Sequence, residues 1–135
     1  MGRTGLIIAA LLMAAPVSAA AAGDEPRYSL GYDRCLNSPD GQNTPGLVKC
    51  ALAELKVQDA RLNRAYTADM AGLAQNPDAK AALLKAQRAW IAFRDADCAT
   101  VRALSGGTIS PFYAASCELK HTARRAQALE ALLAP

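Results

Sequence analysis

Four chemically distinct side chains recur at helical spacing near the middle of the chain. Gln87, Trp90, Arg94 and Cys98 are separated by three, four and four residues. Because an α-helix repeats every ~3.6 residues, this spacing places all of them on one helix face. The sequence therefore predicts a helix that carries an amide, the only tryptophan of the chain, a guanidinium and a thiol along a single stripe.

Three polar residues that each precede a proline mark the starts of helices. A polar N-cap side chain accepts a hydrogen bond from a free backbone N–H group, and proline in the first turn loses no helical hydrogen bond. These starts are Thr44 with Pro45, Asn76 with Pro77, and Ser110 with Pro111. Apolar residues then recur at helical period, and Ser105-Gly106-Gly107 ends the second helix because glycine adopts the left-handed conformation common at helix C-termini. The predicted helices cover residues 44–75, 77–104 and 110 to the chain end.

Residues 23–43 differ in composition from the residues that follow them. They are rich in Pro, Gly, Asn and Asp and carry only short apolar patches, which predicts an irregular N-terminal arm tied down by Cys35. No alternating strand pattern and no internal repeat occurs in the sequence. We therefore expect an all-α fold in which about three helices, within residues 44–135, form one domain with the arm. Short connections make consecutive helices antiparallel neighbours.

The first 22 residues have the organisation of a secretory signal peptide. A basic Arg3 precedes an apolar run from Leu6 to about Ala15, which is too short to span a bilayer. Cleavage sites fit after Val17-Ser18-Ala19 or Ala20-Ala21-Ala22. We expect no transmembrane segment in the mature chain and no lipoprotein cysteine, since the first cysteine is Cys35. The protein is therefore predicted to be periplasmic or secreted.

Four cysteines in an oxidising compartment indicate disulfides. They allow three pairings, and locality favours Cys35 with Cys50 and Cys98 with Cys117. Each of these pairs closes a loop of about 15 to 20 residues and can stabilise the fold by roughly 3 kcal/mol. Metal binding is the alternative, but there is no Cys-x-x-Cys motif and His121 is the only histidine. We therefore expect two disulfides, no metal and no cofactor.

The charge balance argues against nucleic acid as a partner. Without Arg3, fourteen basic and twelve acidic residues leave a net charge of about +2, whereas nucleic-acid binding usually needs clustered Lys and Arg.

A short basic run near the C-terminus consists of Lys120, His121, Arg124 and Arg125. Such runs are mostly solvated helix faces. The alternative is a modest anion-binding patch for a cell-wall polymer or a carboxylate-bearing partner.

Arg94 lies on the same predicted face as Trp90, so its charge must be paired if that face is buried. The structural interpretation, which we favour, pairs Arg94 with helix-end carbonyls or a carboxylate of another helix and makes Trp90 the core anchor. The functional interpretation makes Arg94 a ligand contact in a groove.

Asn63 and Tyr66, one turn apart on the first helix, can meet Gln87 in a small polar network. We favour this network over a solvent-exposed recognition patch.

The acidic residues and the histidine do not form a catalytic set. Asp95 and Asp97 are separated by a single residue, which on a helix puts them on different faces, whereas a glycosidase pair must flank one bond. His121 has no neighbouring serine or free cysteine, because Cys117 is predicted to be oxidised. We therefore expect a protein that is not an enzyme.

Several of these features together resemble a known bacterial family. They are a cysteine pair before and within the first helix, Leu62-Asn63-x-x-Tyr66, Gln87-Arg88-Ala89-Trp90-Ile91-x-Phe93-Arg94-Asp95-x-x-Cys98, a Gly-Gly turn, Cys117, and Thr122-x-Arg124. The pattern resembles the N-terminal domain family of the lysozyme inhibitor LprI, which comprises small secreted or periplasmic helical domains. It covers nearly the whole mature chain. The residues of this motif that we take as structural are Asn63, Tyr66, Gln87, Trp90, Arg94 and Asp95.

The resemblance implies a binding protein whose partner is lysozyme or a related glycan hydrolase. A glycosidase cleft contains two carboxylates that Arg or Lys can contact. A net charge of about +2 gives no long-range attraction to a basic animal lysozyme, so local complementarity must supply the affinity. We expect a contact surface at the turn between the second and third helices. The binding residues expected are Arg88, Arg94, Lys120 and Arg124. The alternative function is a non-inhibitory cell-envelope or stress-related module that binds a protein or peptidoglycan.

Overall fold

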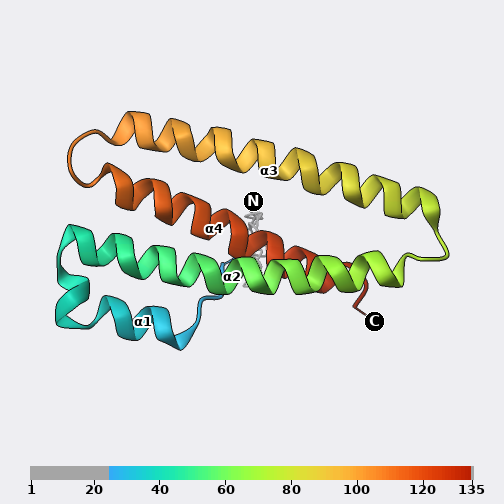
Figure 1. Cartoon of the computed structure of the whole chain (residues 1–135), viewed down its shortest axis with the longest axis horizontal. Helices are drawn as coiled ribbons and strands as arrows, with labels where there is room; N and C mark the ends of the chain where they lie inside the picture. The colour runs from blue at the N-terminus through green and yellow to red at the C-terminus, as the bar shows by residue number, and fades with distance from the viewer. Residues whose placement is uncertain (1–24, 135) are drawn as a thin grey trace, which may run out of the picture.

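The computed structural model describes residues 25–134. Its elements in chain order are α1 (Leu30–Leu36), the 3-10 helix η1 (Pro39–Gln42), α2 (Thr44–Gly72), α3 (Pro77–Ser105) and α4 (Ser110–Leu132) (Figure 1). No strand occurs in the described range, which confirms the all-α class. Within it, no helix combines the length and the apolar character that crossing a membrane requires. The predicted signal peptide, residues 1–22, lies outside the described residues.

The central helix of the bundle is α4. It packs most extensively against α2 and packs against α3 on another side, while α1 and η1 pack against α2. Figure 1 shows that α2 and α4 run in the same direction and that α3 runs the opposite way. Consecutive long helices are therefore antiparallel, as predicted, but α3 depends mainly on α4 for its packing.

The core of the bundle is small and rich in alanine. Ala51 of α2 and Ala123 of α4 are completely buried, so little side-chain bulk separates these helices. The apolar cluster that joins the three long helices consists of Leu62, Leu83, Ala126 and Leu129. Trp90 is partly buried and packs against this cluster, consistent with the role of core anchor. Because few large side chains fill the core, each of them carries a large share of the packing energy.

The prediction of an irregular arm is wrong for residues 30–36 and 39–42, which fold into α1 and η1. Ser29 caps α1, because its Oγ accepts a hydrogen bond from the N–H group of Tyr32 at 3.3 Å. Ser29 also donates its backbone N–H group (2.8 Å) and its hydroxyl (2.5 Å) to the carboxylate of Glu54 on α2, which is only 2% exposed. A helix as short as α1 is unstable alone, so these bonds and the Cys35–Cys50 disulfide hold it in place. The periodicity of the sequence does not indicate such contacts with residues far away in the chain.

The helix starts follow the predicted signals with two differences. Asn76 caps α3 as predicted, and its side chain accepts a hydrogen bond at 3.1 Å from the N–H group three residues on. The cap of α2 is Asn43 rather than Thr44, which is the first helical residue. Ser110 does not cap α4, because its hydroxyl instead donates to the carbonyl of Arg102 at 2.8 Å and ties the start of α4 to the end of α3.

Two glycines end α3 as predicted. Gly106 and Gly107 have φ angles of 58° and 64°, in the left-handed region that favours glycine. Just before them, Leu104 is 82% exposed, and Arg102 is exposed as well. Figure 1 shows this turn at one end of the bundle, the end at which η1 and the start of α2 also lie. We call Arg102, Leu104, Gly106 and Gly107 the tip.

Candidate functional site

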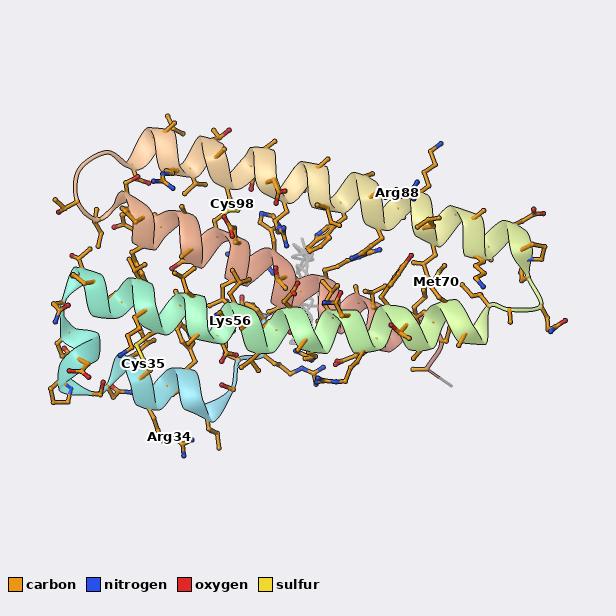
Figure 2. The ribbon with its side chains drawn as sticks, viewed as in Figure 1. Arg34, Cys35, Lys56, Met70, Arg88 and Cys98 are labelled. Carbon is orange, nitrogen blue, oxygen red and sulfur yellow. A yellow bond between two sulfur atoms is a disulfide. The ribbon has the colours of Figure 1, made fainter. Side chains whose placement is uncertain are left out.

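The four basic residues predicted to contact a partner are divided between two helices. Arg88, labelled in Figure 2, and Arg94 belong to α3, whereas Lys120 and Arg124 belong to α4. All except Arg94 are exposed. Because an α-helix rises ~1.5 Å per residue, Arg88 lies roughly 20 Å along α3 from Arg102 at the tip. The predicted basic set is therefore not gathered around the turn.

Arg94 is held against its own helix and against α4. Its guanidinium carbon lies 5.0 Å from the ring centroid of Trp90, and its Nε and Nη2 donate to Asp95 Oδ1 at 2.9 and 2.8 Å. Its Nη1 donates to Thr122 Oγ1 on α4 at 3.5 Å. Only 19% of the Arg94 side chain is exposed. This geometry favours the structural interpretation of Arg94, although its carboxylate partner is a neighbour in sequence and not a residue of another helix.

The polar contacts of Gln87 differ from the predicted network. Its Oε1 accepts a hydrogen bond from Arg125 Nε on α4 at 2.9 Å. Asn63 instead donates to Asp59 on the solvent side of α2 at 3.3 Å, and Tyr66 packs against the apolar cluster. Among the described residues, therefore, Gln87 joins α3 to α4 and not to α2. Sequence spacing identified Gln87 as inward-facing but could not identify the helix that it faces.

Arg125 is also the electrostatic partner of a buried carboxylate. Asp69 of α2 is 5% exposed, and its Oδ2 has no hydrogen-bond partner among the described residues. The same holds for Arg125 Nη2. Burial raises the pKa of Asp69 and the charge of Arg125 opposes the rise, while burial lowers the pKa of Arg125. The two groups thus attract each other without a direct hydrogen bond, in an interior where their charged forms are poorly solvated.

This buried carboxylate gives the protein a specific pH dependence. A raised pKa means that the folded state binds a proton at Asp69 more readily than the unfolded state, so this contribution to stability is lost as pH rises above the ordinary value of 3.8. We expect the free energy of unfolding of the wild type, relative to Asp69→Asn, to increase as the pH is lowered from neutral. Urea titrations of both proteins across this range measure the difference. A difference that stays constant or decreases on acidification would contradict the assignment.

The basic run of α4 is divided between two faces. His121 and Arg125 face α3, where His121 Nε2 lies 2.8 Å from Asp97 Oδ2. Lys120 and Arg124 are exposed. Burial raises the pKa of Tyr28, and the positive charge of Arg124 acts against this rise, which places Arg124 on the side of the arm. Lys120 and Arg124, one turn apart, are therefore the two residues of the run on which the alternative of a modest anion-binding patch depends.

Both disulfides have the predicted local pairing. Cys35 is joined to Cys50 and Cys98 to Cys117, so no free cysteine is present in the described range. The second bridge staples α3 to α4 and brings Asp97, beside Cys98, next to His121, one turn after Cys117. The contact between His121 and Asp97 was not predicted from the sequence. The predicted staple combined with the four-residue spacing of Cys117 and His121 was the signal that could have found it.

Comparison with known proteins identifies the family. A family model described as lysozyme inhibitor LprI matches residues 35–129, a span that includes both disulfides and most of the helical bundle. An uncharacterized protein of Rhizobium meliloti (strain 1021) is 31% identical over 96 residues, which cover 62% of this chain and 69% of that protein. No solved structure matches the chain. The extent of the family match shows that this chain belongs to the lysozyme inhibitor LprI family.

Proposed function

We propose that this protein is a non-catalytic, extracytoplasmic binding protein that inhibits lysozyme or a related glycan hydrolase. The observation that carries the proposal is the match of residues 35–129 to the lysozyme inhibitor family. The two disulfides support an extracytoplasmic location, because such bonds persist in oxidising compartments. The predicted signal peptide would direct the chain there.

We assign the contact to the tip and refine the predicted set of basic residues. A narrow cleft can admit a small exposed turn, and the Gly-Gly turn with exposed Leu104 supplies one. Arg102 is the exposed cation beside it and was not singled out from the sequence. An arginine can pair with the carboxylates of a glycosidase cleft, while an exposed leucine can fill an apolar subsite. Arg94 is a weaker candidate, because its guanidinium already bonds Asp95.

Inhibition of cell-wall hydrolysis tests the proposal. Lysozyme is assayed on bacterial walls with increasing amounts of the oxidised, signal-free protein. We expect dose-dependent inhibition, and we expect Leu104→Ala or Arg102→Ala to raise the half-inhibitory concentration at least about tenfold, as loss of an interface hot spot does.

The control for these variants is Arg88→Ala, because Arg88 is equally cationic, exposed and roughly 20 Å from Arg102 along the helix. It should inhibit like the wild type. Lys120→Ala and Arg124→Ala test the α4 side of the predicted set. Inhibition that depends on Arg88 or these α4 residues but not on Leu104 would relocate the contact, and no inhibition by a folded sample would exclude the function.

A non-inhibitory envelope-binding module is the second candidate function. Exposed apolar side chains on α3, among them Phe93 (56%) and Ile91 (41%), favour a protein over a polymer as its partner. Co-sedimentation with purified peptidoglycan at low and high salt separates the two ligands. Attraction to an anionic polymer through exposed charges decreases with salt, whereas an apolar protein contact does not.

A further inference from the structure

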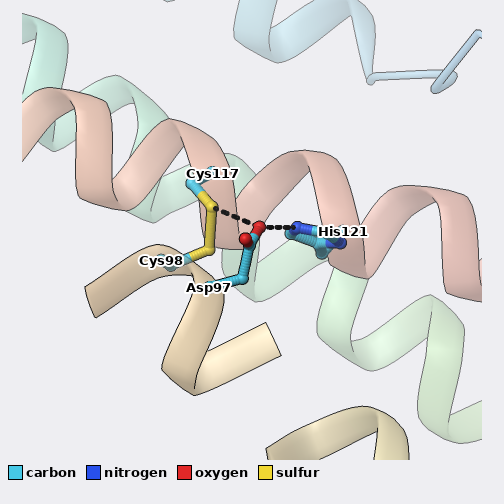
Figure 3. A group of neighbouring side chains, drawn as sticks. All are labelled: Asp97, Cys98, Cys117 and His121. Carbon is cyan, nitrogen blue, oxygen red and sulfur yellow. Dashed lines mark hydrogen bonds and ion pairs between the residues drawn. A yellow bond between two sulfur atoms is a disulfide. The ribbon is translucent and has the colours of Figure 1, made fainter. Parts of the chain in front are cut away.

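A cluster of four metal-ligating side chains lies where the second disulfide joins α3 to α4 (Figure 3). Asp97 and Cys98 come from α3, and Cys117 and His121 come from α4. One ligand atom of each residue lies within 4.8 Å of those of the other three. We propose that reduction of the Cys98–Cys117 disulfide converts this cluster into a four-coordinate Zn²⁺ site.

The arrangement of the donors is what a tetrahedral zinc site requires. Cys117 and His121 are four residues apart and therefore project from the same face of α4. Asp97 Oδ2 lies 2.8 Å from His121 Nε2 and 3.9 Å from Cys117 Sγ, so the carboxylate already sits between imidazole and sulfur. Two thiolates, one imidazole and one carboxylate are all ligand types that Zn²⁺ accepts. Within residues 25–134, no other group of this kind occurs.

The disulfide controls the availability of the two sulfur ligands. In the oxidised protein each sulfur is bonded to the other and carries no thiolate charge. A dithiol donates two electrons and two protons to the bridge, which gives two cysteine thiols and leaves the dithiol as a disulfide. Zn²⁺ then displaces both thiol protons and binds the thiolates, with its other ligands His121 and Asp97. Zn–S bonds of ~2.3 Å place the sulfurs about 3.8 Å apart in a tetrahedral site, so a small side-chain rotation suffices.

Once the second disulfide is reduced, its cysteines lie where a bound cation would stabilise their thiolates. Cys98 is 2% exposed, and a thiolate there is poorly solvated unless a cation neutralises it. The side chains of Asp97 and His121 are 43% and 26% exposed, so the metal has access from their side. The Cys35–Cys50 pair offers no comparable set, because the nearby Glu54 already accepts bonds from Ser29 and Gln58.

The test is a Zn²⁺ titration of the intact protein in competition with a chromophoric chelator. A trialkylphosphine opens both disulfides, with water supplying the oxygen of the phosphine oxide and the two thiol protons. We expect one Zn²⁺ per reduced chain, and we expect Co²⁺ in its place to show the visible absorption of tetrahedral thiolate coordination. The oxidised protein should bind neither ion at these concentrations.

Variants distinguish this site from binding by any pair of thiols. Asp97→Asn and His121→Gln should each weaken Zn²⁺ binding at least about tenfold, since even the loss of an outer-shell partner costs 10- to 100-fold. The paired Cys98→Ser/Cys117→Ser variant should lose the site, whereas the matched Cys35→Ser/Cys50→Ser variant should keep it. Circular dichroism follows helicity in each sample. Equal affinity in the two paired variants, or no Zn²⁺ binding by the reduced wild type, would overturn the proposal.

Discussion

Replacing Leu129 with alanine is expected to lower the free energy of unfolding by about 2–5 kcal/mol. Leu129 is 1% exposed and belongs to the small apolar cluster that joins α2, α3 and α4. The substitution removes buried apolar surface and leaves a cavity that two rigid helices cannot close.

Urea or guanidinium unfolding, followed by circular dichroism, measures this loss. Leu132→Ala is the matched control, because Leu132 lies one turn further along α4 and is 50% exposed. Its loss should cost about 0.5 kcal/mol or less, as is usual for surface substitutions. A Leu129→Ala variant no less stable than Leu132→Ala would show that the apolar cluster does not hold the bundle together.

Removing the Cys98–Cys117 disulfide is expected to cost roughly 3 kcal/mol. The bridge closes a loop with a sequence separation of 19 residues and restricts the unfolded chain. In the folded state it also fixes α3, whose packing is mainly against α4. The Cys98→Ala/Cys117→Ala variant should therefore lose global stability, and the backbone amides of α3 should exchange with solvent faster than those of α2.

The other disulfide provides the comparison. Cys35–Cys50 has a similar sequence separation of 15 residues, so the effect on the unfolded chain is similar. Its removal should instead free α1 and η1, while amide protection in α3 is retained. Faster exchange in α3 after loss of Cys35–Cys50, or unchanged exchange in α3 after loss of Cys98–Cys117, would contradict this division of roles.

Features encoded within a few residues were predictable from the sequence. Asn76 and the following proline marked the start of α3, and Gly106 with Gly107 marked its end, because caps and left-handed glycines act locally. The two disulfides followed from sequence proximity in the same way. The all-α class and the inward position of Gln87 came from helical periodicity alone.

Features that depend on distant partners were not predictable. Helix α1 forms because buried Glu54 receives the N–H group and hydroxyl of Ser29, two groups 25 residues away in sequence. Ser110 resembles an N-cap locally, yet its hydroxyl bonds the carbonyl of Arg102. Gln87 was correctly placed facing inward, but its partner Arg125 lies on a helix that spacing does not specify. In each case the local sequence allows more than one structure, and a tertiary contact decides which of them forms.

The residues of the candidate contact surface were also only partly predictable from the sequence. Sequence reasoning selected cations by type and motif, and so it included Arg94, which the structure holds against Trp90 and Asp95. It did not select Arg102, although this residue lies three positions before the predicted Ser105-Gly106-Gly107 break.

Direct titration of lysozyme with the oxidised, signal-free protein tests the central claim, that this chain binds the enzyme through its tip. Calorimetry at two temperatures avoids missing a complex whose binding enthalpy is near zero at one of them. The proposal requires a saturable heat change that corresponds to a defined complex and that weakens in Leu104→Ala but not in Arg88→Ala. No saturable heat change at either temperature, from a sample whose helical content is intact, would contradict it.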